Sequence, residues 1–117
     1  MKTPSENFEC KTFARWLSRQ TALLFSKIPV GDSTLSGKEG KLLTSLGVRR
    51  GIPDFAIVHR GTGRVFFVEM KRARGGRLSR EQELWLTALD KCGCVAYGNK
   101  DAQRHVTEYY KKDGLKL

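Results

Sequence analysis

The N-terminal segment has apolar residues at helical spacing. Phe13, Trp16 and Leu17 fall on one face of a helix and predict that this face packs against a core. Thr3 and Glu6 form a Thr-x-x-Glu capping box, which predicts that the helix starts with Thr3 as its N-cap. The sequence therefore predicts a first amphipathic helix from the beginning of the chain.

A short strand and a polar stretch follow this helix. Residues 23–28 form a mostly apolar run that ends at Pro29 and predicts a strand. Residues 31–40 are polar and contain glycine, so we expect a mobile loop there. Residues 41–46 predict a short helix that Gly47 closes.

Two apolar runs in the middle of the chain predict a β-hairpin. Residues 55–58 and residues 65–68 each have strand composition, and the turn signal at residues 61–63 separates them. Asp54 directly precedes the first run and Glu69 directly follows the second. Pairing of the two strands therefore brings both carboxylates to one edge of a sheet.

A basic connector and a second long helix come next. Residues 72–77 combine arginine with glycine and predict a flexible connection. Ser79 and Gln82 form another capping box at the start of a helix, and Gly93 is expected to end it. One side of this helix carries Gln82, Trp85 and Leu89.

The C-terminal part predicts one more strand and one more helix. Residues 94–97 are almost entirely apolar, which is typical of a buried strand. Asp101 is expected to cap a helix that runs to about residue 112, with Ala102, Val106 and Tyr109 on one face. The order of elements indicates an α/β fold in which helices flank a central mixed sheet, with residues 1–117 as a single domain.

The charge of the chain indicates an anionic partner. The 117 residues contain 22 Lys and Arg against 12 Asp and Glu, and the formal net charge is +10. A basic excess of this size in a small domain favours nucleic acid, while an acidic protein or a membrane surface remains an alternative.

The sequence favours a reduced, intracellular setting. It has no apolar run near the ~20 residues that a membrane span requires, and its start does not resemble a signal peptide. The three cysteines, Cys10, Cys92 and Cys94, are an odd number without zinc-site spacing, so we interpret them as reduced thiols.

The acidic residues at the hairpin are candidates for metal-dependent chemistry. Glu69 continues an apolar strand, where a carboxylate is costly unless it is paired or bound to a metal. Lys71 points to the same face because strand side chains alternate. Taken alone, Pro53-Asp54 is a common turn pair and Lys71 is an ordinary solvated lysine. Their combination with Glu69 favours a functional site.

The residue types at these positions suggest metal-dependent hydrolysis of a phosphodiester. Asp54, Glu69 and the main-chain carbonyl of Met70 offer oxygen ligands for Mg²⁺ or Mn²⁺, which lowers the pKa of a water and neutralises phosphate charge. Lys71 can orient the water or stabilise developing negative charge. Gln82 and Glu6 are further candidates, although helix capping alone explains both.

Six arginines flank the two acidic motifs and are candidates for DNA contact. They lie in predicted loops or at a helix start, where guanidinium groups can bind phosphates in a bidentate manner. No recognition helix or zinc finger is evident, so we expect contacts to the backbone and to the shape of the nucleic acid. The six are Arg49, Arg50, Arg72, Arg74, Arg77 and Arg80.

Two other motifs do not predict a site. The stretch 31–38 is similar to a P-loop, but its glycine spacing is wrong and Glu39 replaces the required Ser or Thr, so no nucleotide cofactor is expected. His59 and His105 have no partners at the spacing of a catalytic pair.

The motifs together resemble the VRR-Nuc (virus-type replication-repair nuclease) family of the PD-(D/E)xK superfamily. The resemblance rests on residues 48–54, on Glu69-Met70-Lys71 and on Gln82 with Trp85, and it extends to Glu6 and Trp16 in the first helix. It implies a restriction-endonuclease-like core. It also implies that Asp54, Glu69 and the Met70 carbonyl bind the metal, that Lys71 is the catalytic lysine, and that Gln82 and Glu6 are further active-site groups.

The resemblance also implies a substrate and an assembly. A chain this short is similar to the stand-alone phage and bacterial members, which implies a cytoplasmic protein of a bacterium or of a phage-infected host cell. It also implies a homodimer that cuts branched DNA such as four-way (Holliday) junctions. Three alternatives stay open: a monomeric nuclease acting on flaps or ends, a basic DNA-binding module without activity, and a restriction enzyme that reads a short sequence.

Overall fold

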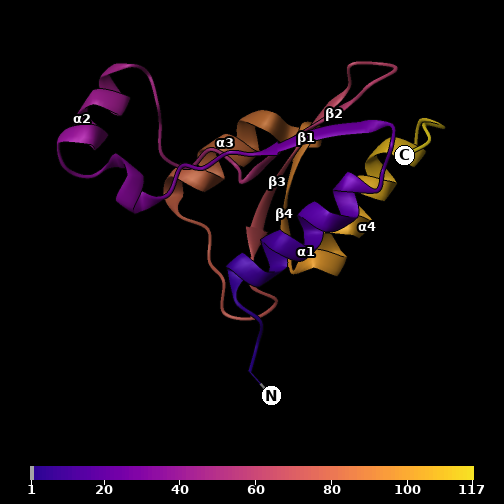
Figure 1. Ribbon diagram of the computed structural model, residues 1–117, viewed down its shortest axis with the longest axis horizontal. Coiled ribbons are helices and arrows are strands. Elements are labelled where there is room, and N and C mark those ends of the chain that lie inside the picture. Colours follow the sequence, from indigo (N-terminus) through magenta and orange to yellow (C-terminus); the bar gives the residue numbers. More distant parts are fainter. Residues whose placement is uncertain (1) are drawn as a thin grey trace.

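A mixed four-stranded sheet organises the protein (Figure 1). The computed structural model describes residues 2–117. The strands lie in the order β1-β2-β3-β4; the first three are antiparallel and β4 runs parallel to β3. The elements are α1 (Glu6–Ser18), β1 (Leu23–Lys27), η1 (Asp32–Leu35), α2 (Gly37–Ser45), β2 (Phe55–His59), β3 (Val65–Lys71), α3 (Arg80–Leu89), η2 (Asp90–Cys92), β4 (Gly93–Tyr97) and α4 (Asn99–Lys111). The expected α/β fold with a mixed sheet is confirmed.

Helices α1 and α4 lie side by side and cover one face of the sheet (Figure 1). The core between these helices and the sheet is apolar. Alternate residues of each strand point to the same face, and those that face α1 and α4 are mostly apolar. Phe13 of α1 meets Phe55 of β2 edge-on, with 5.1 Å between ring centroids. The fully buried side chains of this core include Leu17, Ile57, Val68, Met70, Val106 and Tyr110.

The opposite face of the sheet carries the polar site and contacts α3. In β3, Val68 and Met70 belong to the apolar core, so the alternating residues Glu69 and Lys71 point to the other face of the sheet. Gln82 of α3 donates a hydrogen bond to Glu69, which shows that α3 borders this second face. The alternation along β3 therefore directs its apolar residues into the core and its polar residues toward the site.

The segment before β2 forms an arm that stands away from the sheet (Figure 1). Helix α2 packs on η1, and its Leu42 and Leu46 are 59% and 72% exposed. The expected loop over residues 31–40 is therefore wrong in part, since η1 and the first turn of α2 occupy most of it. The two helical pieces support each other locally, which composition alone does not reveal.

The helix starts differ from the sequence prediction in two places. The N-cap of α1 is Ser5, whose Oγ accepts from the amide of Phe8, so the predicted cap at Thr3 is wrong. Glu6 is consequently the first helical residue and not a capping-box member. Helix α4 begins at Asn99, so Asp101 lies in its first turn and accepts a hydrogen bond from the amide of Tyr97 instead of capping the helix.

The faces and ends of the C-terminal helices are close to those predicted. The Ser79–Gln82 capping box of α3 is confirmed, while the helix ends at Leu89 and η2 intervenes before Gly93. Tyr110, and not Tyr109, is the fully buried tyrosine of α4. No helix within residues 2–117 has the length and apolarity to cross a membrane.

We expect Phe13→Ala to lower the free energy of unfolding by about 3–5 kcal/mol, because it leaves a cavity where a fully buried ring met Phe55. Phe8→Ala, on the same helix but 55% exposed, is the matched control and should stay within about 0.5 kcal/mol. Urea denaturation followed by circular dichroism measures both. Equal effects of the two variants would contradict the packing of α1 described above.

Candidate active site

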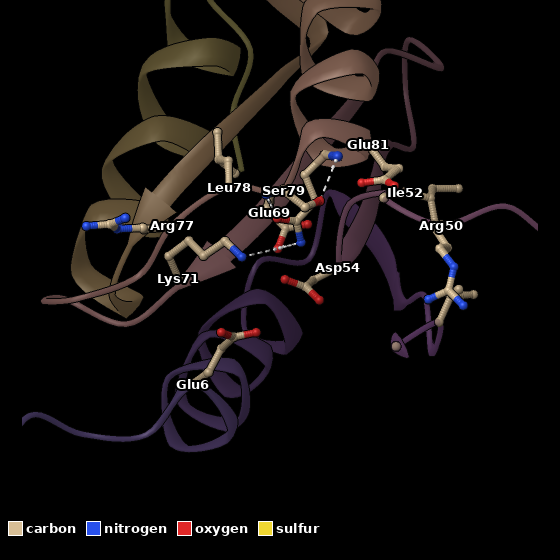
Figure 2. A pocket seen from close by; sticks show the side chains of 14 residues that line it. Glu6, Arg50, Ile52, Asp54, Glu69, Lys71, Arg77, Leu78, Ser79 and Glu81 are labelled. Carbon is tan, nitrogen blue, oxygen red and sulfur yellow. Dashed lines mark hydrogen bonds and ion pairs between the residues drawn. The ribbon is translucent and has the colours of Figure 1, made fainter. Parts of the chain in front are cut away.

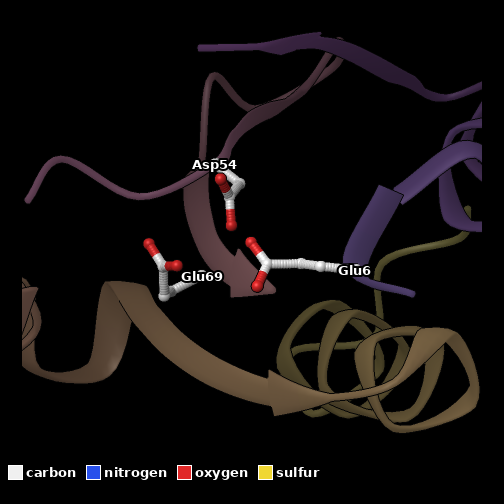
Figure 3. A group of neighbouring side chains, drawn as sticks. All are labelled: Glu6, Asp54 and Glu69. Atoms are coloured by element: carbon white, nitrogen blue, oxygen red, sulfur yellow. The ribbon is translucent and has the colours of Figure 1, made fainter. Parts of the chain in front are cut away.

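Three carboxylates converge at the end of the β2–β3 hairpin (Figure 3). Asp54 directly precedes β2, Glu69 lies near the end of β3, and Glu6 is the first residue of α1. One oxygen from each of them lies within 4.8 Å of the others. The two residues predicted from the hairpin are therefore joined by the third from a different part of the chain.

Asp54 is held from two sides. Its Oδ2 accepts a hydrogen bond of 2.7 Å from the main-chain amide of Met70. Its Oδ1 lies 3.6 Å from the ammonium of Lys27, at the end of β1. The Met70 amide belongs to β3, so this bond connects the loop before β2 to the strand that carries Glu69. The Asp54 carboxylate is thus oriented toward the other two acids.

Glu69 is only 2% exposed and has two polar partners besides the acids. Its Oε2 lies 3.7 Å from Nζ of Lys71 and accepts a hydrogen bond of 3.1 Å from Nε2 of Gln82. The Oε1 of Gln82 in turn accepts from the amide of Ser79, which completes the capping box of α3. Gln82 therefore contacts the site and caps the helix at the same time, so the two alternatives for this residue coexist.

The acids perturb each other's proton affinity. The pKa of Glu69 is raised to about 9, first by burial and then by the negative charge of Asp54 and a hydrogen bond with it; Lys71 opposes the rise. The pKa of Glu6 is also raised, mainly by burial and next by Asp54, against the effects of Lys71 and Lys27. Burial and mutual repulsion thus disfavour the ionised forms of Glu69 and Glu6, and a cation bound among the acids would favour them.

The loop that carries Asp54 is fixed against α3. Gly51 has a φ of +87°, and a Cβ there would lie 2.4 Å from the main-chain carbon of Glu81. Only glycine permits this close approach of two backbones. The indole of Trp85 donates a hydrogen bond of 3.1 Å to the carbonyl of Arg50. These contacts set the distance between Asp54 and the first turn of α3.

An open cavity of about 1040 Å³ leads to the carboxylates (Figure 2). Glu6, Asp54, Glu69 and Lys71 line its floor, and the start of α3 lines another side. Two of the six predicted arginines, Arg50 and Arg77, are part of the lining. The cavity therefore combines acidic groups with cationic groups from two separate loops.

The other four predicted arginines lie outside this lining but remain at the surface. Arg49 donates hydrogen bonds to the carbonyls of Thr44 and Val48, and so braces the arm. Arg72, Arg74 and Arg80 are exposed in or next to the connector between β3 and α3.

Two residues that contact or support the site could not be identified from the sequence. Lys27 looks like an ordinary solvated residue at a strand end, and only the pairing of β1 with β2 brings it to Asp54. Glu9 is 8% exposed, and its Oε1 accepts from the amide of Asn99 at 3.3 Å. This contact ties α1, which carries Glu6, to the start of α4. Neither partner lies near in the sequence, so local patterns hold no signal for them.

Comparison with known proteins identifies the family. The model of the VRR-NUC domain matches residues 9–98. The chain belongs to the VRR-NUC domain family. A solved structure described as a VRR_NUC domain protein has 19% sequence identity, covers 99% of this chain and 98% of its own, and superposes with a TM-score of 0.72. No curated protein matches the chain.

Membership of the VRR-NUC family implies a nuclease-type function in DNA processing, and this class of nuclease generally uses divalent metals. The matched residues include Asp54, Glu69, Lys71 and Gln82, whereas Glu6 lies outside them. The donor set fits such an ion, because hard divalent cations prefer carboxylate oxygens and three of these converge here.

We expect the VRR-NUC domain, kept in chelator, to lose stability as the pH rises from about 5 to about 9. In this window the folded protein binds a proton at Glu69 that the unfolded chain has released, so the free energy of unfolding falls by at most about 1.4 kcal/mol per pH unit. Thermal unfolding across this pH range measures the effect. Glu69→Gln should flatten the dependence, and an equally steep fall in that variant would assign it to other groups.

Proposed function

We propose that this protein is a Mg²⁺- or Mn²⁺-dependent, structure-selective DNA endonuclease. Its substrate is branched DNA, with four-way (Holliday) junctions as the main target, and it acts as a homodimer. The observation that supports this most directly is the group of three carboxylates within 4.8 Å of one another, next to the buried Lys71 on the floor of an arginine-lined cavity.

The carboxylates of Asp54, Glu69 and Glu6 would hold the ion, together with the main-chain carbonyl of Met70. When bound, a divalent cation neutralises charge on the phosphate and favours deprotonation of the attacking water. Asp54 and Glu69 are held by the Met70 amide and by Gln82, so the donors are in place before the ion binds. Preorganised oxygen donors of this kind support the assignment of Mg²⁺ or Mn²⁺.

Lys71 supplies the fixed positive charge of the reaction. Its side chain is 10% exposed and its ammonium lies 3.7 Å from Glu69, so it reaches the cavity without being free in solvent. An ammonium in this position stabilises the negative charge that develops on the phosphate, and it can orient the water. Gln82 acts indirectly by holding Glu69 in position.

The arginines provide binding that does not depend on base sequence. Arg50 and Arg77 line the cavity from opposite loops, and the exposed Arg72, Arg74 and Arg80 extend the cationic surface along the connector before α3. Arg49 borders the arm. Guanidinium contacts to phosphates fix the position of the DNA without reading its bases, and this favours recognition by structure.

The proposal of a homodimer rests on the symmetry of the cleavage reaction. One site cuts one strand, so symmetric cleavage of a four-way junction requires two sites related by a two-fold axis. A monomer would instead leave single cuts, as expected for a nuclease acting on flaps or ends. A module that only binds DNA has no need of the acidic cluster with its adjacent lysine.

We expect the purified protein to cut four-way junctions in the presence of Mg²⁺ or Mn²⁺ and to be inactive in chelator. The assay compares linear, flap and four-way DNA of equal length, and gels resolve whether cuts occur in symmetric pairs. Light scattering gives the mass of the particle. Single cuts by a monomer would favour the flap- or end-directed alternative, and binding without cleavage under all metal conditions would favour the non-catalytic one.

We expect Lys71→Ala to reduce the cleavage rate at least about 100-fold while junction binding changes little, because the lysine acts on developing charge and the arginines provide most of the affinity. Single-turnover cleavage and a gel-shift titration in Ca²⁺ measure the two effects. Lys112→Ala, at the far end of α4, removes the same charge away from the site and should preserve both. Cleavage by Lys71→Ala at the wild-type rate in saturating metal would reject this role.

A further inference from the structure

A second lysine contacts the carboxylate cluster from outside the cavity. Lys27 ends β1, and its ammonium lies 3.6 Å from Oδ1 of Asp54. We infer that Lys27 is the counter-charge of Asp54 and that a divalent cation has to displace it when it binds. This inference rests on the proposed function, because it concerns the same metal site.

The geometry at Asp54 places the two cations in competition. The Oδ2 atom already accepts a hydrogen bond of 2.7 Å from the Met70 amide, and Oδ1 faces Lys27. Both oxygens of the carboxylate therefore have a partner. An ion held between Asp54, Glu69 and Glu6 competes with the ammonium for the same negative charge. The competition follows because like charges repel over such distances.

The two lysines of the cluster differ in their freedom to move. The side chain of Lys71 is 10% exposed and pairs with Glu69 inside the cavity. The side chain of Lys27 is 45% exposed and lies outside the residues that line the cavity. A compact ammonium on a long, solvated stem can leave its partner at little cost. The ammonium of Lys27 therefore moves away from Asp54 when the ion binds, while Lys71 stays at the site.

The role of Lys27 is to offset negative charge in the carboxylate cluster. Three carboxylates within 4.8 Å repel one another, and each of two lysines offsets the charge of a different one: Lys71 that of Glu69, and Lys27 that of Asp54. A divalent ion bound among the three carboxylates adds positive charge to the group, which favours the approach of a DNA phosphate. Lys27 thus supports the fold before the ion binds and limits how tightly the ion is held.

The test measures Mn²⁺ affinity without DNA, by electron paramagnetic resonance of the free ion at constant pH and ionic strength. We expect Lys27→Met to bind Mn²⁺ about two- to fivefold more tightly than the wild type, which is the range that an exposed ion pair supports. Lys27→Arg keeps the charge and should bind like the wild type. Lys112→Met removes one charge at the distant end of α4 and should also bind like the wild type.

A second readout uses the nuclease assay. If Lys27→Met binds the ion more tightly, its cleavage should reach half of the maximal rate at a correspondingly lower Mn²⁺ concentration. Unchanged or weaker Mn²⁺ binding by Lys27→Met, with normal binding by the wild type, would overturn the inference and leave the proposed nuclease intact. Equal tightening in Lys112→Met would overturn it too, since the effect would then reflect net charge. No Mn²⁺ binding by the wild type would refute both the inference and the metal site.

Discussion

The contact between the carboxylates of Asp54 and Glu69 is the constraint on which the rest of the site depends. Placing a carboxylate at 2% exposure is unfavourable, and a second acid beside it adds repulsion. The surrounding groups offset this cost with a main-chain amide, a glutamine and two lysines. The close approach of Gly51 to the main chain of Glu81 holds the loop before Asp54 next to the first turn of α3. The polar half of the molecule is therefore arranged around one unfavourable pair.

Local patterns in the sequence were sufficient for the hairpin and for α3. Strands β2 and β3 are adjacent in the chain and α3 has its own capping box, so Asp54, Glu69 and Gln82 could be brought together from periodicity and turns alone. The arm was harder to predict. Its helix packs mainly on η1, and its glycines and polar residues have the composition of a loop.

The remaining parts of the site depend on tertiary packing. Glu6 was named as a candidate, but its predicted place in a capping box was wrong; it reaches the acids because Phe13 and Leu17 anchor α1 on the sheet and Glu9 holds the helix to α4. Lys27 depends on the pairing of β1 with β2. Such contacts join segments that are distant in the chain, and no periodicity within a segment encodes them. The stability of the core and the geometry of the cluster are therefore coupled through α1.

The alternation along β3 has a consequence for folding. Val68 and Met70 enter the apolar core while Glu69 and Lys71 face the cavity, so a shift of this strand by one residue would exchange the two sets. Such a slipped sheet would place an acid and an ammonium in the apolar core and leave a valine and a methionine among the polar groups of the cavity. A shifted register is therefore unfavourable on both faces of β3. Glu69 and Lys71, which are proposed to act in the reaction, thus also favour the correct register of β3.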